Sequence, residues 1–98
     1  MSEWHVYLLR SADGSLYTGI TTDVERRLEA HRNGRGAKAL RGRGPLEIEN
    51  FASAGDRARA SRVERKIKAL KKKDKEALAR STAELRRFVE AAGAKDEP

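Results

Sequence analysis

The sequence contains no cysteine and only two histidines, which excludes several kinds of site. Without cysteine there is no disulfide framework and no thiolate metal site, and two histidines are too few for a histidine-rich zinc site. No stretch approaches the roughly 20 apolar residues that a membrane-spanning helix needs. Residues 1–7 lack the basic and then apolar segments of a secretory leader. We therefore expect a cytoplasmic protein with no membrane partner.

Aromatic and apolar residues are also few. Of the 98 residues, 5% are aromatic and 38% are hydrophobic, which allows only a small core. A typical domain has roughly 100–150 residues. We therefore predict one domain over residues 1–93 and a frayed tail over residues 94–98.

The net charge of +7 is concentrated in one part of the chain. Residues 1–34 hold four basic and five acidic side chains (net −1), residues 35–73 hold thirteen and four (net +9), and residues 74–98 hold five and six (net −1). Positive charge confined to one region predicts a polyanionic partner, with nucleic acid first. A solvated basic helix face and a patch for acidic membrane lipid are the alternatives.

Three segments have the patterns of β-strands. His5–Ser11 is short, apolar and bounded by polar residues, and Leu16–Ile20 follows it after Asp13-Gly14, a dipeptide favoured in tight turns. These segments predict a β-hairpin. Leu46–Phe51 alternates apolar and polar residues, which predicts a third, half-exposed strand.

Three helices are predicted from capping residues and apolar spacing. Thr22–Glu25 fits a capping box for a first helix that ends at Gly34. Ser53 and Asp56 offer a cap for a second helix, whose apolar stripe is Ala60, Val63, Ile67 and Leu70. Ser81 opens the third. The order ββαβαα predicts an α+β fold, a small three-stranded antiparallel sheet with packed helices.

Two tyrosines on the predicted hairpin resemble the signature of the GIY-YIG nuclease superfamily. Tyr7 ends the triplet HVY, where the family name has GIY, and Tyr17 begins YTG, where it has YIG. The rest of the family layout follows in order: Arg27 and His31 on the first helix, a basic loop, and Glu64 on the second helix. The resemblance covers about residues 4–80 and is to the small stand-alone bacterial members.

The resemblance implies a metal-dependent endonuclease that hydrolyses DNA phosphodiester bonds, in DNA repair or on branched DNA. It implies that Glu64 binds Mg²⁺ or Mn²⁺ and that Arg27 stabilises charge on the scissile phosphate. One carboxylate with water and phosphate oxygens suits Mg²⁺, and a guanidinium can hold two phosphate oxygens. Tyr7 and Tyr17 would activate or position the attacking water, with His31 as the partner base.

Each of these residues also has a purely structural interpretation. Glu64 and Lys68 are spaced as a favourable i,i+4 ion pair. Arg27 can pair with Asp23 on a solvated helix face, His31 can be an exposed helix residue, and tyrosine in a strand commonly packs in a core.

The segment from residue 34 to 45 interleaves glycines with cations and is predicted to form a mobile phosphate clamp of Arg35, Lys38, Arg41 and Arg43. A plain flexible linker is the alternative. The basic residues of the second helix and the lysine run 71–73 are predicted to extend the clamp. Gly19 is expected to allow a close backbone approach after the second strand.

Several family members carry an asparagine late in the domain, whereas this chain has none after Asn50. That difference motivates a second hypothesis, a nucleic-acid-binding module that keeps the fold without catalysis. A basic adaptor for an acidic protein or lipid surface is the third.

Overall fold

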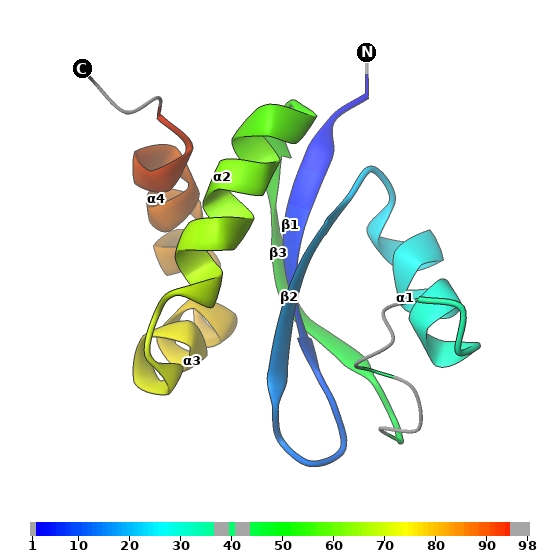
Figure 1. Cartoon of the computed structure of the whole chain (residues 1–98). Coiled ribbons are helices and arrows are strands. Elements are labelled where there is room, and N and C mark those ends of the chain that lie inside the picture. Colours follow the sequence, from blue (N-terminus) through cyan, green and yellow to red (C-terminus); the bar gives the residue numbers. More distant parts are fainter. Residues whose placement is uncertain (1, 37–39, 41–43, 95–98) are drawn as a thin grey trace.

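The structure is a computed structural model that describes residues 2–36, 40 and 44–94. Its elements are β1 (Trp4–Arg10), β2 (Leu16–Thr21), α1 (Val24–Arg32), β3 (Glu47–Gly55), α2 (Arg57–Lys68), α3 (Lys72–Arg80) and α4 (Thr82–Gly93), as Figure 1 shows. The strands form an antiparallel sheet in the order β2-β1-β3. The predicted α+β class is therefore confirmed.

The hairpin turn forms where the Asp13-Gly14 dipeptide predicted it. Gly14 has φ +87°, a conformation that a side chain disfavours. The Asp13 carboxylate accepts a hydrogen bond from the Ser15 backbone N–H at 3.0 Å, and the Ser11 N–H donates to the Ser15 carbonyl at 3.0 Å. The turn therefore spans five residues between the last paired residues, Arg10 and Leu16.

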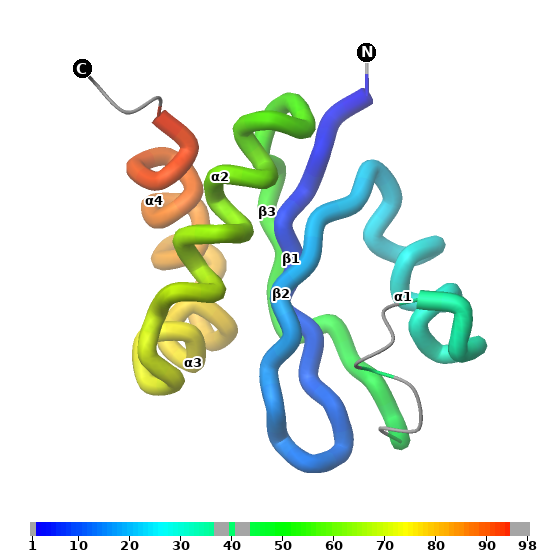
Figure 2. Tube along the Cα trace, in the orientation of Figure 1, coloured from blue at the N-terminus to red at the C-terminus, as the bar shows by residue number. Residues whose placement is uncertain are grey.

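The sheet separates two apolar clusters, because successive side chains of β1 point to opposite faces. Val6 and Leu8 pack with α2, α3 and α4 in the larger cluster. Tyr7 and Leu9 belong to a smaller cluster on the other face, against which Leu28 of α1 packs. Figure 2 shows the resulting layers, with α2–α4 on one side of the sheet and α1 on the other.

The predicted helices form, with corrections at their ends. Asp23, rather than Thr22, caps α1, and its carboxylate accepts from the Arg26 N–H at 3.1 Å. Asp56 caps α2 in the same way, whereas Ser53 lies in β3. The predicted stripe of α2 is buried at Ala60, Val63 and Ile67, and Leu70 follows the end of the helix.

The structure has one helix more than the sequence predicted. Residues 72–80 form α3, which begins without a side-chain cap because its N-cap residue is Lys71. A tertiary ion pair holds this helix: the Arg10 guanidinium of β1 contacts both carboxylate oxygens of Glu76, at 2.6 and 2.7 Å. Arg10 also contacts Glu49 of β3 at 2.9 Å. The bidentate contact between Arg10 and Glu76 thus holds α3 against the sheet.

The C-terminal tail and the absence of a membrane-spanning segment were both predicted from the sequence. The predicted tail, residues 94–98, lies outside the described residues except for Ala94. Across the described ranges, no helix is long and apolar enough to cross a bilayer.

Candidate active site

A hydrogen bond between the hairpin and α1 lies at the centre of the candidate site. Tyr7 Oη of β1 and His31 Nε2 of α1 are 2.7 Å apart. Both residues are buried, with 1% of Tyr7 and 3% of His31 exposed. His31 is therefore not the exposed helix residue of the structural interpretation.

Gly19 makes this bond possible. It pairs with Tyr7 across the hairpin, and the Tyr7 ring lies over it. A Cβ at Gly19 would be 2.4 Å from Tyr7 Oη and 2.5 Å from Cζ. The group that closely approaches Gly19 is thus the Tyr7 side chain. Without a side chain at Gly19, the phenol can pass over β2 and reach His31 on α1.

Tyr17 completes a cluster of three aromatic rings. It pairs with Leu9, two residues beyond Tyr7 on β1, so the two tyrosines share one face of the sheet. The ring centres of Tyr17 and Tyr7 are 6.3 Å apart, and those of Tyr17 and His31 are 5.6 Å apart in an edge-to-face arrangement. Tyr17 is only partly buried, whereas Tyr7 is enclosed.

The environment keeps both Tyr7 and His31 uncharged at neutral pH. Burial raises the pKa of Tyr7 to about 12, although the neighbouring Arg27 guanidinium opposes the shift. Burial, followed by the positive charge of Arg27, lowers the pKa of His31 below its usual range. Arg27 is thus close enough to act on both groups.

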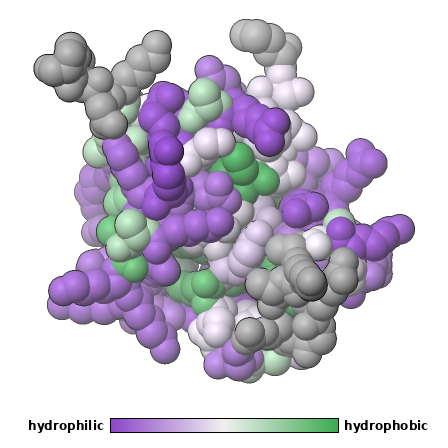
Figure 3. Space-filling model, viewed as in Figure 1, coloured by the Kyte–Doolittle hydropathy of each residue, from purple (hydrophilic) through white to green (hydrophobic). Residues whose placement is uncertain are grey.

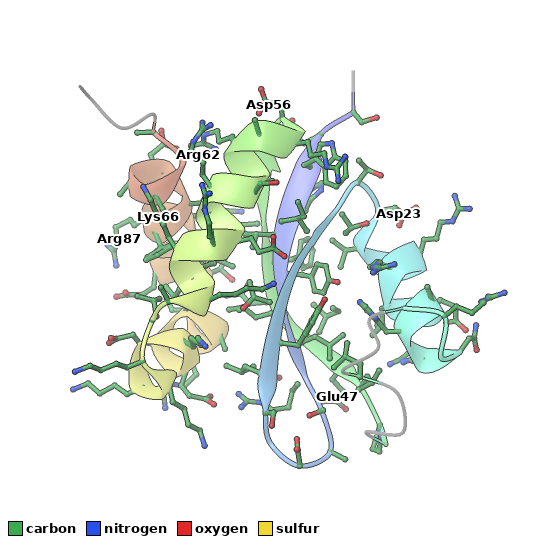
Figure 4. The ribbon with its side chains drawn as sticks, viewed as in Figure 1. Asp23, Glu47, Asp56, Arg62, Lys66 and Arg87 are labelled. Carbon is green, nitrogen blue, oxygen red and sulfur yellow. The ribbon has the colours of Figure 1, made fainter. Side chains whose placement is uncertain are left out.

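Arg27 and Arg26 occupy different surroundings on α1. Arg27 is half-buried one turn before His31, whereas Arg26 is exposed. Both line a hollow of about 280 Å³ beside the N-terminus of the helix, where Figure 4 labels Asp23. Of the two arginines, Arg27 is the one whose charge acts on Tyr7 and His31.

Glu64 approaches this cluster from the opposite layer. It lies on α2, which packs against β2, one of the two edge strands of the sheet. Its carboxylate charge contributes to the raised pKa of Tyr7. Its partner Lys68, at 3.4 Å, has its ammonium 5.9 Å from the centre of the Tyr17 ring. The predicted i,i+4 pair is therefore present, and it lies near Tyr17.

Of the described residues around this cluster, Glu64 is the carboxylate that a metal ion could use. Within residues 2–36, 40 and 44–94, no group of three or more His, Asp or Glu side chains could hold a metal ion. A single partly exposed carboxylate does not fit a closed structural site. It does fit Mg²⁺, which keeps several waters and shares the phosphate oxygens of a substrate.

The predicted basic surface is only partly described. Arg35 is exposed at the start of the loop, whereas Lys38, Arg41 and Arg43 lie outside the described residues. Hydrophilic side chains cover most of the face shown in Figure 3. Lys71–Lys73 are exposed at the start of α3.

Several cations of α2 have a structural role that their positions in the sequence did not predict. Arg62 donates to the Gly93 carbonyl at 2.9 Å, and Lys66 donates to the Ala92 carbonyl at 3.2 Å. Figure 4 shows both side chains on the side of α2 that faces α4. Arg59 contacts Glu90 at 3.5 Å. Arg62 and Lys66 thus satisfy C-terminal carbonyls of α4, which is a packing role. The extension of the clamp along α2 stays a prediction.

Gly36 is a further site residue that the sequence did not single out. A Cβ there would be 2.0 Å from His31 Nδ1. The backbone at the start of the basic loop thus lies directly on the imidazole. Alternating glycines in the sequence gave no sign of which one contacts a side chain.

These features together define a class: a small α+β domain with two tyrosines on a hairpin, Arg and His on the next helix, and Glu at the sheet edge. The sequence pattern of the family described as "GIY-YIG catalytic domain" matches residues 3–77. The chain belongs to this family of nuclease domains, and the resemblance seen in its sequence is confirmed. Such domains act on nucleic acid and generally use divalent metal ions.

The relatives are small bacterial proteins. The chain is 55% identical over 78 residues to the UPF0213 protein YhbQ of Escherichia coli O8 (strain IAI1), covering 80% of this chain and 78% of that protein. It is 56% identical over 78 residues to the UPF0213 protein in the potE 3′ region of Serratia liquefaciens, covering 80% and 76%. The solution NMR structure of the UPF0213 protein BH0048 from Bacillus halodurans matches with a TM-score of 0.51 and 43% identity, covering 78% of this chain and 81% of that one. Their names carry a family number and no reaction.

Proposed function

We propose that this chain is a Mg²⁺-dependent endonuclease that hydrolyses DNA phosphodiester bonds in the cytoplasm, in repair or on branched DNA. The observation that carries the proposal is the hydrogen bond between Tyr7 and His31, next to Arg27 and within electrostatic reach of Glu64. An ordinary core does not require a buried imidazole, a guanidinium and a carboxylate around one phenol. A phosphodiester hydrolase requires a base, a cation for the phosphate and a ligand for a metal.

The proton of the attacking water is proposed to leave through Tyr7 to His31. A phenol with a pKa of about 12 is a poor free base at neutral pH, because almost none of it is ionised. Neutral His31 solves this problem by accepting the Tyr7 proton at Nε2 while Tyr7 Oη takes a proton from the water. Tyr7 ends neutral and His31 ends as imidazolium, so the lowered pKa of His31 keeps the acceptor ready.

Arg27, Glu64 and Tyr17 are proposed to handle the phosphate. Arg27 stays charged at every relevant pH and would offset the negative charge that develops on phosphorus. Glu64 would hold Mg²⁺, which supplies Lewis acidity and a second positive charge when bound. Tyr17, the more accessible phenol, would orient the water or a phosphate oxygen.

The basic residues of the loop are proposed to hold the nucleic-acid backbone away from the reacting bond. Arg35, Lys38, Arg41 and Arg43 remain the predicted contacts. Each phosphate contact steepens the salt dependence of binding. The whole domain, residues 1–93, is proposed to act as one unit.

The experiment that tests the proposal is nicking of supercoiled plasmid DNA with Mg²⁺. We expect Arg27→Ala and Glu64→Ala to abolish nicking while circular dichroism spectra stay unchanged. Arg26→Ala is the matched control, because it removes the same charge from the exposed flank of α1. Wild-type rates from both purified site variants would refute the assignment and indicate a contaminating nuclease.

A non-catalytic nucleic-acid-binding module is the second candidate, favoured by the lack of an asparagine after Asn50. In the structure Asn50 itself bonds the Leu78 carbonyl at 2.9 Å and serves the packing of α3. This alternative predicts salt-dependent DNA binding with no Mg²⁺-dependent product even at high protein concentration. The same plasmid assay with a binding titration separates the two.

A further inference from the structure

Lys68, the last residue of α2, places its ammonium beside the carboxylate that is proposed to bind a metal ion. Its Nζ lies 3.4 Å from Glu64 Oε2 and 5.9 Å from the centre of the Tyr17 ring. We propose that Lys68 is a displaceable internal cation: it neutralises Glu64 until a divalent ion arrives, and then transfers to a phosphate oxygen of the nucleic acid. This inference rests on the proposed function. It gives Lys68 the role of leaving Glu64 when the metal ion binds and of then contacting the substrate phosphate.

The geometry of the pair suits displacement. Charge-assisted hydrogen bonds are usually about 2.7–2.9 Å long, and this contact is longer, at 3.4 Å. The Lys68 side chain is 53% exposed, against 24% for Glu64, so the ammonium can leave into solvent while the carboxylate stays at the sheet edge. Exposed i,i+4 pairs contribute little to stability, and four flexible methylenes give the ammonium several directions to move.

Comparison with the other cations of the helix layer distinguishes Lys68 from a structural charge. Arg62 and Lys66 donate to backbone carbonyls of α4. The Arg10–Glu76 pair that holds α3 to the sheet is bidentate, with contacts of 2.6 and 2.7 Å. Within the described part of the chain, Lys68 makes one long ion-pair contact, to Glu64, and lies near the ring of Tyr17. Both are proposed site residues. Its surroundings are those of the site.

An internal cation that changes partners predicts two effects of opposite sign. Without Lys68, a divalent ion no longer competes with an ammonium for Glu64 and is no longer repelled by it. Two like charges about 5 Å apart still interact appreciably even in water, so we expect divalent-ion binding to the free protein to tighten roughly two- to tenfold. Nucleic-acid binding in the presence of a saturating divalent ion should weaken, because the phosphate contact that Lys68 makes after its displacement is lost. A lysine that only supports the helix would not produce this pair of changes.

The first measurement is a titration of Mn²⁺ alone against the full chain, with free Mn²⁺ followed by electron paramagnetic resonance. We expect Lys68→Met to lower the Mn²⁺ dissociation constant roughly two- to tenfold. Lys68→Arg keeps the charge and should stay near wild type. Lys73→Met is the matched control, since it removes an exposed lysine from α3 and changes the net charge equally. An equal effect from Lys73→Met would overturn the inference, because net charge alone would then explain it.

The second measurement is fluorescence anisotropy with a DNA oligonucleotide at saturating Mn²⁺, with the Lys68 variants made in the Arg27→Ala background so that the DNA is not cut. Lys68→Met should bind more weakly than Arg27→Ala alone, and Lys68→Arg should recover most of the affinity. Unchanged DNA affinity in Lys68→Met would overturn the transfer to phosphate.

Glu64→Gln separates failure of this inference from failure of the proposed function. If Mn²⁺ binds Glu64→Gln as well as wild type, Glu64 is not the metal ligand, and both proposals fall. If Mn²⁺ binding needs Glu64 but is unchanged or weakened in Lys68→Met, only the displaceable cation is wrong. Weaker Mn²⁺ binding in Glu64→Gln together with tighter binding in Lys68→Met supports both.

Discussion

Replacing Gly19 with alanine tests whether the Tyr7 phenol crosses β2 as described. The backbone of Gly19 does not have positive φ, so alanine can adopt its conformation. At such a position alanine normally stabilises a protein by about 0.4–1 kcal/mol, because it restricts the unfolded chain. Here the added methyl group would lie 2.4–2.9 Å from Oη, Cζ and Cε2 of Tyr7. The predicted effect therefore has the opposite sign.

The magnitude follows from two terms. Overpacking a well-filled site costs about 1–3 kcal/mol. Displacing the ring also removes the hydrogen bond to His31, worth about 0.5–1.5 kcal/mol net. We expect Gly19→Ala to lower the free energy of unfolding by about 2–4 kcal/mol, with each kcal/mol shifting Tm by about 4–8 °C in a domain of this size. Nuclease activity should fall with it, because the proposed proton path is broken.

A double-mutant cycle in urea, followed by circular dichroism, assigns the cost to Tyr7. Tyr7→Leu keeps an apolar side chain but lacks the three atoms that the methyl would meet. In that background Gly19→Ala should cost less than about 0.5 kcal/mol, a coupling well outside the range for independent sites. Tyr7→Phe retains Cζ and Cε2, so the steric cost should persist there without the hydrogen-bond cost. Equal costs in all three backgrounds, or stabilisation of the wild type, would refute the described packing.

Four further predictions follow from the charges and pKa values. Because burial raises the pKa of Tyr7 to about 12, the unfolded state loses its phenol proton first, and unfolding free energy should fall by about 2–3 kcal/mol between pH 10 and 12; urea titrations should show no such loss in Tyr7→Phe. Because the pKa of His31 is lowered by burial, the unfolded imidazole is protonated first on acidification, so stability should decline as pH falls below about 6.5; His31→Gln should reduce that slope. Arg10→Met should destabilise the fold by about 1–2 kcal/mol in thermal melts, and Arg10→Lys should recover less than half, because an ammonium cannot form the fork to Glu76. Arg62→Met should lower stability but leave the salt dependence of DNA binding unchanged, since this guanidinium is bound to the end of α4; a reduced salt slope would contradict its packing role.

The sequence was sufficient for those parts of the fold that local signals determine. Alternating or apolar segments marked all three strands, and the carboxylates of Asp23 and Asp56 cap α1 and α2. Helix α3 was not predicted, because it begins with lysines and has no capping side chain at its N-terminus. Its anchor, the pair between Arg10 and Glu76, joins residues 66 positions apart and has no local signature.

The geometry of the site depends on the length of the hairpin turn, which the sequence did not determine. A two-residue turn at Asp13-Gly14 would pair Tyr17 with Arg10 and put the two tyrosines on opposite faces of the sheet. The observed five-residue turn pairs Tyr17 with Leu9, so both tyrosines face α1. Which residues meet there was thus suggested by family resemblance and could not be worked out from spacing.

The unequal layering of the sheet has a consequence for motion. Among the described residues, the cluster beneath α2–α4 has twelve buried members, whereas the cluster on the α1 side has four. Detaching α1 exposes less apolar surface to water than unfolding the sheet together with α2–α4. Amide hydrogens of α1 should therefore exchange with deuterium sooner than those of β1. The helix that carries Arg27 and His31 is therefore expected to open before the sheet does.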